Sequence, residues 1–311
     1  MFSRWSIAGL LAVATVAGTH LTAQSQRPLG VVSEDAIRII PFFDGWTRNN
    51  DGTVSLSFGY AGPNRSTVEI PLGPDNVITP KEFDGRQPTS FPPVVFVPPV
   101  GQGDTSNIGA PAAALPAYLG TYGIVRERGT FTVSVPGDFK GDVVWTLRYQ
   151  GQTWTVPGRT KATAYELSWP MAMGSVPPLV RFQPNGSAGR GPAGLQGPAL
   201  EARVGQPVEL AVWLHDDGIH EKEPIPVKRD LVPSMNATWF KHSGPVGGQI
   251  EFKPAKQPIA DVQGRATTMA VFSEPGEYVV RVRGDSFGNI DSTPDDQCCW
   301  TNGYWKVRVT R

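Results

Sequence analysis

Alternation of apolar and polar residues along the first half of the chain predicts short β-strands. Apolar side chains occupy every second position in residues 54–60, 130–135 and 143–149. Successive side chains of a strand point to opposite faces, so each segment would bury one row and expose the other. The segments are bounded by Gly, Pro, Asn and Asp, which favour turns. No long apolar stripe of period 3.6 accompanies them, so helices are not expected.

The second half of the chain repeats the pattern. Residues 208–214, 278–282 and 305–309 alternate in the same way, and in the last segment Trp305, Val307 and Val309 form the predicted inward row. Many short strands separated by turn signals are typical of β-sandwiches. The predicted fold class is therefore all-β, with two immunoglobulin-like β-sandwich domains joined by a Pro/Gly-rich linker.

Glycine and proline mark the predicted domain boundaries. The chain has 35 Gly and 30 Pro in 311 residues, and both interrupt regular structure. We expect an N-terminal sandwich over residues 31–157 with a Pro-rich insertion over 86–122, a linker over 168–198, and a C-terminal sandwich over 199–311. Within the linker, residues 179–182 are a candidate first strand of the second domain. The insertion would pack on the domain surface; the alternative is a partner-docking segment in polyproline geometry.

The N-terminus has the pattern of a secretory signal peptide over residues 1–23. Arg4 precedes an apolar stretch from Ile7 to Val16, and small residues near Ala23 suit cleavage. The stretch is shorter than the about 20 residues that a membrane span needs. We therefore expect a secreted or periplasmic protein whose mature chain has no membrane span; the alternative is an uncleaved N-terminal anchor.

The charge of the chain is balanced, with 28 Lys and Arg against 28 Asp and Glu. The basic residues form no cluster, which disfavours nucleic acid and anionic membranes as partners.

Three motifs occur in a fixed order in the C-terminal part. Asp216-Asp-Gly218 follows one predicted strand, Ser243-Gly-Pro245 follows a strand containing Trp239, and Pro275-Gly-Glu-Tyr278 leads into a third. This order resembles PKD-like and REJ-like extracellular modules over residues 200–284. The resemblance implies an immunoglobulin-like sandwich used for spacing, adhesion or binding, and implies no catalytic residue.

The N-terminal half has its own resemblance. Phe43-Asp-Gly-Trp46 and residues 133–139 are similar to the front half of uncharacterised secreted proteins of environmental bacteria. That resemblance implies no function.

The only two cysteines are neighbours, Cys298 and Cys299. In an oxidising compartment they could form a vicinal disulfide, an intermolecular bridge, or remain thiols. Bridging adjacent residues strains the bond, which makes it easier to reduce. We expect a structural disulfide or buried pair; the alternative is a redox or soft-metal role.

Acidic residues in loops form a candidate calcium site. Asp216, Asp217, Asp285 and Asp291 fall on predicted loops that could meet at one end of a sandwich. Carboxylate oxygens suit Ca²⁺. The alternative is a set of solvated loops. A structural calcium ion is the only candidate cofactor.

Trp46, Trp213 and Trp300 are candidate ligand-binding residues, because the tryptophans of this chain cannot all lie in a core. Trp213 is opposite the buried row of its strand and should face solvent or the other domain. Exposed indoles can bind sugar rings or proline-rich peptides. The favoured alternative is packing between domains.

Motifs of common enzyme classes are missing from the sequence, including the nucleophile elbow, the zinc-protease helix and the phosphate-binding glycine loop. The sequence therefore predicts a secreted, non-enzymatic structural or adhesion/binding module. The alternative is a carbohydrate-binding protein that uses exposed tryptophans, with or without structural calcium. A further alternative is the redox or soft-metal role of the cysteines.

Overall fold

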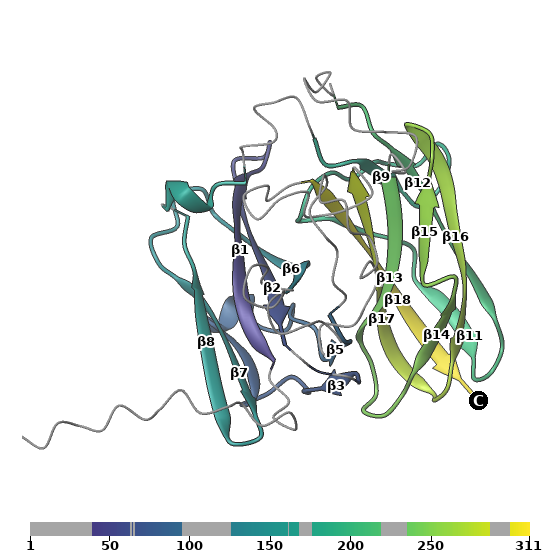
Figure 1. Cartoon of the computed structure of the whole chain (residues 1–311), viewed down its shortest axis with the longest axis horizontal. Helices are drawn as coiled ribbons and strands as arrows, with labels where there is room; N and C mark the ends of the chain where they lie inside the picture. The colour runs from purple at the N-terminus through teal and green to yellow at the C-terminus, as the bar shows by residue number, and fades with distance from the viewer. Residues whose placement is uncertain are drawn as a thin grey trace, which may run out of the picture. The chain divides into compact units, whose positions relative to one another are not determined.

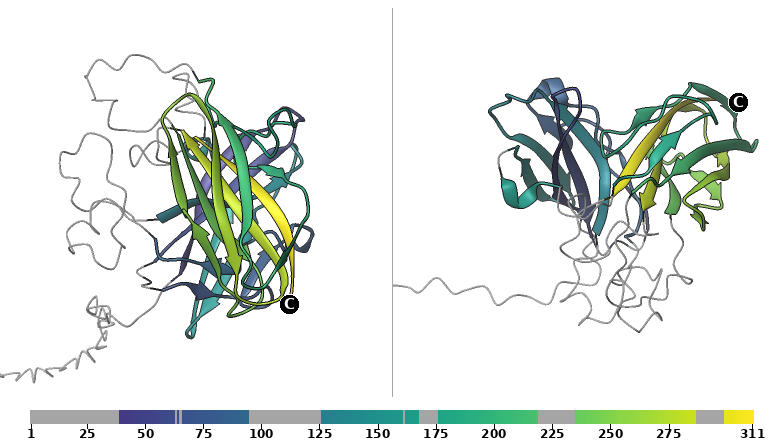
Figure 2. Two further views of the ribbon diagram at one scale, coloured as in Figure 1. Left: turned by 90° about the vertical axis from the view of Figure 1, so that its right-hand side faces the viewer. Right: turned by 90° about the horizontal axis from the view of Figure 1, so that it is seen from above.

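A computed structural model gives the fold of this protein (Figures 1 and 2). It describes residues 39–62, 64, 66–94, 126–160, 162–167, 176–218, 235–286 and 299–311. Residues 37–311 form one compact unit. In the described part of the chain the regular structure is β-strand and two 3₁₀ turns, η1 (Lys81–Phe83) and η3 (Thr163–Tyr165), with no α-helix. The all-β prediction is confirmed.

The first sandwich has two antiparallel three-stranded sheets. One has the order β1-β2-β6, from β1 (Ile40–Arg48), β2 (Val54–Ala61) and β6 (Arg126–Val135). The other has the order β4-β7-β8, from β4 (Asn76–Thr79), β7 (Val143–Tyr149) and β8 (Gln152–Gly158). The short strands β3 (Val68–Glu69) and β5 (Ser90–Phe91) pair beside them.

Aromatic rings from both sheets form the first core. Phe58 of β2 stacks on Phe131 of β6 with ring centroids 5.1 Å apart, and Phe131 meets Trp145 of β7 edge-on at 4.8 Å. The apolar rows predicted in these strands are therefore core. The polar row of β2 is buried as well. Its serine hydroxyl groups are satisfied there by hydrogen bonds, Ser55 with Asn49 and Ser57 with Asp44.

The second sandwich has a six-stranded and a four-stranded sheet. The larger has the order β10-β18-β17-β13-β15 with β11 also on β18; its strands are β10 (Leu195–Gln196), β11 (Leu200–Arg203), β13 (Met235–Ser243), β15 (Lys256–Ile259), β17 (Gly276–Ser286) and β18 (Trp300–Thr310). The smaller has the order β14-β16-β12-β9, from β9 (Leu179–Arg181), β12 (Val208–His215), β14 (Ile250–Lys253) and β16 (Gln263–Phe272). Strands β10 and β11 run parallel to β18, and the other pairs are antiparallel.

One hydrophobic core lies between these two sheets. Trp305 of β18 meets Phe182 edge-on with ring centroids 4.5 Å apart, and Phe272 of β16 meets Tyr278 of β17 at 5.0 Å. The predicted inward row of β18 is buried, while alternate residues from Lys306 onward are exposed. The burial of one row from each sheet holds the layers together.

The range predicted as a linker contains part of the second sandwich. Within residues 176–198, β9 pairs with β12 and β10 pairs with β18. Val180 and Gly189 exchange two backbone hydrogen bonds, which satisfies polar groups in this Gly-rich segment. The described part of the predicted linker therefore belongs to the second sandwich.

Several predictions fall outside the described residues. The proposed signal peptide and most of the Pro-rich insertion are among them. The first residues of the insertion are described: Phe91 is buried and meets Tyr60 edge-on at 5.2 Å. No helix in the described ranges has the length and apolar character that crossing a bilayer requires.

Candidate functional site

The two sandwiches meet through buried charged side chains. We call Glu127, Phe240, Arg281, Arg283 and Asp285 the inter-sandwich cluster. Glu127 comes from β6 of the first sandwich, and the other four come from β13 and β17 of the second. Because charged groups are seldom buried unless they are paired, this cluster is the most unusual local chemistry in the described chain.

Both arginines of the cluster bind the backbone of β6. Arg281 donates from Nη1 to the carbonyl of Gly129 at 2.5 Å, and Arg283 donates from Nη1 to the carbonyl of Arg128 at 2.8 Å. Each guanidinium also pairs with the Glu127 carboxylate; the Arg281 distance is 3.3 Å. The first sandwich thus binds two cations of the second through two neutral carbonyls and one shared carboxylate, which compensates one of the two positive charges.

The second sandwich supplies the other side of the cluster. Arg283 Nε lies 3.0 Å from a carboxylate oxygen of Asp285. The Phe240 ring centroid is 4.1 Å from the guanidinium carbon of Arg281 and 5.3 Å from that of Arg283. Guanidinium groups are weakly hydrated and bind well to aromatic rings, so this ring helps to offset their desolvation.

Irregularities in β1 and β6 place these backbone acceptors. The pairing of β1 with β2 changes register between Phe43 and Gly45. The pairing of β2 with β6 changes register around Gly129. Gly129 has φ +58°, and a Cβ added there would lie 2.1 Å from the indole nitrogen of Trp300. A β-bulge bends its strand and changes the direction in which nearby groups point. The Gly129 amide therefore donates to Asp44 at 2.9 Å.

The carbonyl of Gly129 is shared between two donors. Besides Arg281, the side-chain amide of Asn302 donates to it at 2.9 Å. Asn302 lies in β18, so three strands of the two sandwiches meet at this one peptide group.

Burial changes the ionisation of the acidic and basic groups here. It raises the pKa of Asp44 to about 6, although Arg126 and hydrogen bonds from Gly129 and Ser57 lower it. It likewise raises the pKa of Asp285 to about 6, against the opposing effect of Arg283.

The guanidinium groups respond in opposite directions. Burial, followed by repulsion from Arg283, lowers the pKa of Arg281 despite attraction from Glu127. For Arg283 the opposing attraction of Asp285 and Glu127 exceeds the effect of burial, and its pKa is raised. Arg283 is thus the better compensated cation.

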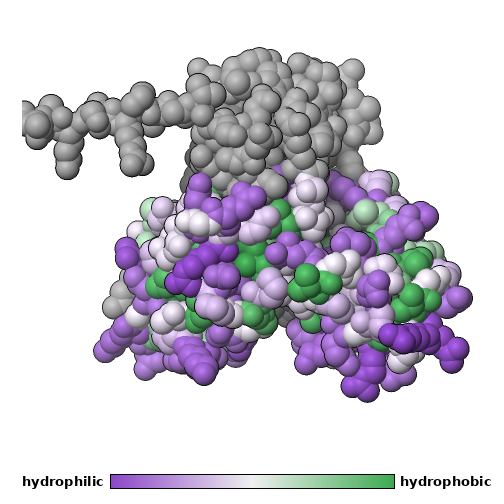
Figure 3. Space-filling view, turned by 90° about the horizontal axis from the view of Figure 1, so that it is seen from below, coloured by the Kyte–Doolittle hydropathy of each residue, from purple (hydrophilic) through white to green (hydrophobic). Residues whose placement is uncertain are grey.

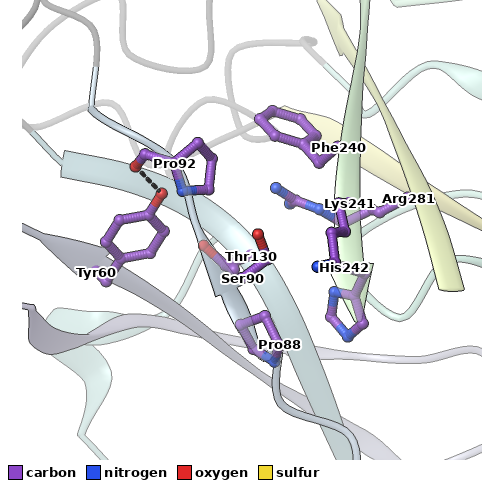
Figure 4. A pocket seen from close by; sticks show the side chains of 9 residues that line it. All are labelled: Tyr60, Pro88, Ser90, Pro92, Thr130, Phe240, Lys241, His242 and Arg281. Atoms are coloured by element: carbon purple, nitrogen blue, oxygen red, sulfur yellow. Dashed lines mark hydrogen bonds between the residues drawn. The ribbon is translucent and has the colours of Figure 1, made fainter. Parts of the chain in front are cut away.

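A small pocket lies beside the cluster (Figure 4). It is lined from the first sandwich by Tyr60, Pro88, Ser90, Pro92 and Thr130, and from the second by Phe240, Lys241, His242 and Arg281. The Tyr60 hydroxyl donates to the carbonyl of Pro92 at 2.7 Å. The space suits about one water molecule, so it does not accommodate an organic substrate.

His242 fixes the same contact from the second sandwich. Burial lowers its pKa to about 3, with a further contribution from Arg281. The ring is therefore neutral, and Nε2 donates to the carbonyl of Arg86 at 3.0 Å. The backbone carbonyl of His242 accepts from the Thr89 amide at 2.9 Å. The imidazole is a structural contact between the sandwiches in this arrangement.

Two of the three candidate ligand-binding tryptophans are enclosed. Trp46 is 3% exposed and donates its indole N–H to the carbonyl of Ala162 at 2.9 Å. Trp300 is 1% exposed and packs over Gly129. Both rings lie in the interior and are not exposed as ligand binding would require, and Trp300 packs against the first sandwich, in the manner of the favoured alternative. Trp213 is half-buried on the face of β12 opposite its core row, as its position in the alternation predicts.

The acidic residues of the predicted calcium site are engaged separately. Asp217 forms an ion pair with Arg190 at 2.7 Å, and Asp285 pairs with Arg283. Asp216 is buried and accepts the Gly218 amide at 3.0 Å; Asp291 lies outside the described residues. Within the described ranges no three His, Cys, Asp or Glu side chains are grouped for a metal ion. The calcium site stays a prediction.

The cysteine pair is described on one side only. Cys299 is buried and disulfide-bonded, and its carbonyl accepts the Ser286 amide at 3.0 Å. Cys298 lies outside the described residues. The vicinal disulfide and the redox or soft-metal alternative therefore remain predictions.

No family model matches the chain, and no curated protein matches it. Among solved structures it is similar to domains 4 and 5 of the S-layer protein SbsC, with 13% identity over 58% of this chain and 70% of that one, at a TM-score of 0.22. It is similar to domains 4–9 of SbsC with 12% identity, over 89% of this chain and 29% of that one, at 0.23. It is also similar to the Yersinia pseudotuberculosis adhesin InvE with 8% identity, over 88% and 59%, at 0.20. These TM-scores do not establish a shared fold.

Proposed function

We propose that this chain is a secreted, non-enzymatic structural or adhesion module, in which two immunoglobulin-like sandwiches act as one rigid spacer. The observation that carries the proposal is the inter-sandwich cluster. Domains of one chain move relative to each other by default, unless a large interface, usually a hydrophobic one, restrains them. Here Arg281 and Arg283 are buried against the first sandwich, and separating the sandwiches would break their charge-assisted hydrogen bonds to its backbone and their ion pairs with Glu127.

The strand order supports the immunoglobulin-like assignment. In the second sandwich, β9, β12, β16 and β14 correspond to strands A, B, E and D, while β13, β17 and β18 correspond to C, F and G. In the first, β1-β2-β6 and β4-β7-β8 correspond to A-B-E and C-F-G. Strands β10, β11 and β15 are additions to this plan.

Two side chains of the second sandwich support the same assignment. Trp239 is buried on β13, at the position of the core tryptophan of strand C. The Tyr278 hydroxyl, near the start of β17, donates to the carbonyl of Glu274 at 2.9 Å. A tyrosine at this corner that bonds to the backbone a few residues upstream is typical of the fold.

The surface and the pocket support a non-enzymatic role. On the face drawn in Figure 3, apolar residues are interspersed with polar ones. The pocket beside the cluster is too small for a substrate, and the histidine that lines it is neutral and hydrogen-bonded. Rigid spacing is a function that such a surface can serve without a catalytic centre.

The proposal is tested by measuring flexibility. Labels carried by non-natural amino acids at the exposed residues Leu72 and Val262 would report one narrow distance distribution between the sandwiches. Arg283→Gln should broaden it, and Arg308→Gln, which removes an exposed ion pair with Glu277 on the same sheet, should not. A broad distribution in the unaltered protein would refute the rigid spacer.

Two further assays test the non-enzymatic role and the secretion of the protein. Turnover of a polysaccharide, ester or peptide at an enzymatic rate would refute the non-enzymatic role. Recovery of the protein from the culture medium or periplasm is the result expected for a secreted module.

A further inference from the structure

The outer face of the four-stranded sheet carries an indole between two guanidinium groups. Trp213 of β12 is paired directly with Arg181 of β9 on one side and with Arg265 of β16 on the other. Directly paired positions of antiparallel strands project to the same face. The guanidinium carbon of Arg265 lies 5.5 Å from the Trp213 ring centroid. These three residues form a cationic aromatic row across the sheet.

The row is not used to join the sandwiches. Residues Val212 and Leu214 of β12 point into the core of the second sandwich, so Trp213 points away from it. The described hydrogen bonds between the sandwiches that surround the inter-sandwich cluster come from the other sheet, through β13, β17 and β18. The half-buried indole is therefore on a surface that the packing of the two sandwiches leaves uncovered.

The charge on this row is only partly compensated. Arg265 forms an exposed ion pair with Glu209, which lies four residues from Trp213 along β12. Arg181 has no ion pair with any residue that the structure describes. Exposed ion pairs are weak and exchange readily with other anions. Among the described residues, the row thus offers one guanidinium without an ion pair and one that can change partner.

The neighbouring positions leave the row accessible along the strands. The next outward pair on one side is Ala211 with Thr267, and on the other it is His215 with Gln263. None of these side chains is a large apolar residue that would turn the row into a hydrophobic interface. A flat, polar surface with one aromatic ring favours a hydrated, extended ligand over a protein core.

We propose that this row binds an acidic polysaccharide, with carboxylated sugar residues as the recognised units. The indole would contact the apolar face of a sugar ring, and the guanidinium groups would bind its carboxylates, for which their planar donors are suited. Strands β9 and β16 flank β12, and strand spacing places their backbones about 10 Å apart. An extended polymer lying across the sheet can reach both arginines. This binding does not depend on the rigidity of the spacer, so either proposal can fail alone.

The test is a calorimetric titration of the full chain with oligogalacturonate at low and high salt. We expect binding that weakens with salt, and at least a ten-fold loss of affinity in Trp213→Ala and in the double variant Arg181→Gln/Arg265→Gln. Trp154→Ala on β8 and Arg308→Gln on β18 are matched controls, because they remove a half-buried tryptophan and an exposed arginine elsewhere; they should bind as the unaltered protein does.

Four results would overturn the proposal. The protein could fail to bind oligogalacturonate, or it could bind a neutral glucan or poly-glutamate as tightly as it binds oligogalacturonate. The fourth such result is an affinity for oligogalacturonate that the variants of the row leave unchanged. If Trp213→Ala does not fold, as judged by circular dichroism, Trp213→Leu, which removes the ring but keeps an apolar side chain, and Arg181→Gln replace it, and each should lower the affinity relative to the control variants.

Discussion

Gly129 shows how one residue can position a contact between two sandwiches. Its φ of +58° lies in the left-handed region, and Trp300 occupies the space where a side chain would begin. The same residue donates its amide to Asp44 and offers its carbonyl to Arg281 and Asn302. Conformation and packing therefore require glycine at this position, and its backbone amide and carbonyl make the polar contacts.

We predict that Gly129→Ala lowers the free energy of unfolding by about 2–4 kcal/mol, from left-handed strain and from overpacking against Trp300. Urea denaturation measures the loss. Gly52→Ala is the matched control, since Gly52 has φ +85° but open space around it. The control should lose only the strain contribution, and equal losses in the two variants would contradict the packing argument.

Asp44 makes stability depend on pH. Burial raises its pKa to about 6, above the usual value of 3.8 for an aspartate. A carboxyl whose pKa is raised in the folded state contributes stability below the unfolded pKa, and loses that contribution as pH rises through the folded pKa. The free energy of unfolding should therefore fall as Asp44 ionises between about pH 4 and pH 6, by about 3 kcal/mol at most.

Asp44→Asn tests this dependence, because the amide keeps an acceptor for Gly129 but does not ionise. Relative to the unaltered protein, the variant should gain stability as pH is raised from 4.5 to 7.5. Urea unfolding at the two pH values gives the difference. A variant whose relative stability is the same at both would show that Asp44 does not control it.

Strand β17 shows what sequence pattern can and cannot predict about an element. The row Tyr278, Val280 and Val282 is apolar and alternates, so its strand and core face are predictable. The other row contains Arg281 and Arg283, which would suit a solvated face equally well. Their acceptors on β6 lie more than 150 positions away in sequence, and no local pattern reveals them.

The same limit applies to the segment before β11 and to the aromatic residues. Glycine and proline in residues 185–194 predict a linker, whereas the pairing of β9 and β10 depends on distant partners in β12 and β18. Trp46 and Trp300 are likewise enclosed by remote contacts. Of the three candidate tryptophans, only Trp213 could be placed on its face from local alternation.

At the scale of this strand, we predict that Arg283→Met lowers the free energy of unfolding by about 3–5 kcal/mol, because Asp285 would remain buried without its ion-pair partner and Glu127 would keep only Arg281. Arg308→Met, on the adjacent β18, removes an exposed pair and should have little effect. Thermal and urea unfolding of both variants provide the comparison; similar losses would argue against a special role for the cluster.

In the whole molecule, the cluster should couple the unfolding of the two sandwiches. We expect one transition in urea, with tryptophan fluorescence and far-ultraviolet circular dichroism coinciding. In Arg283→Met the transition should separate into two. Two resolved transitions in the unaltered protein would mean that the sandwiches unfold independently and would weaken the rigid-spacer proposal.

Strand β18 has a consequence for the order of events during synthesis. It pairs with β17, β10 and β11, and it carries the Trp300 and Asn302 side chains that reach Gly129. Until residues 300–310 have left the ribosome, the second sandwich lacks a central strand and the first lacks the ring that packs on its bulge. The nascent polypeptide therefore keeps an incomplete second sandwich until β18 is synthesised, and the same strand then supplies the ring that packs on Gly129 of the first sandwich.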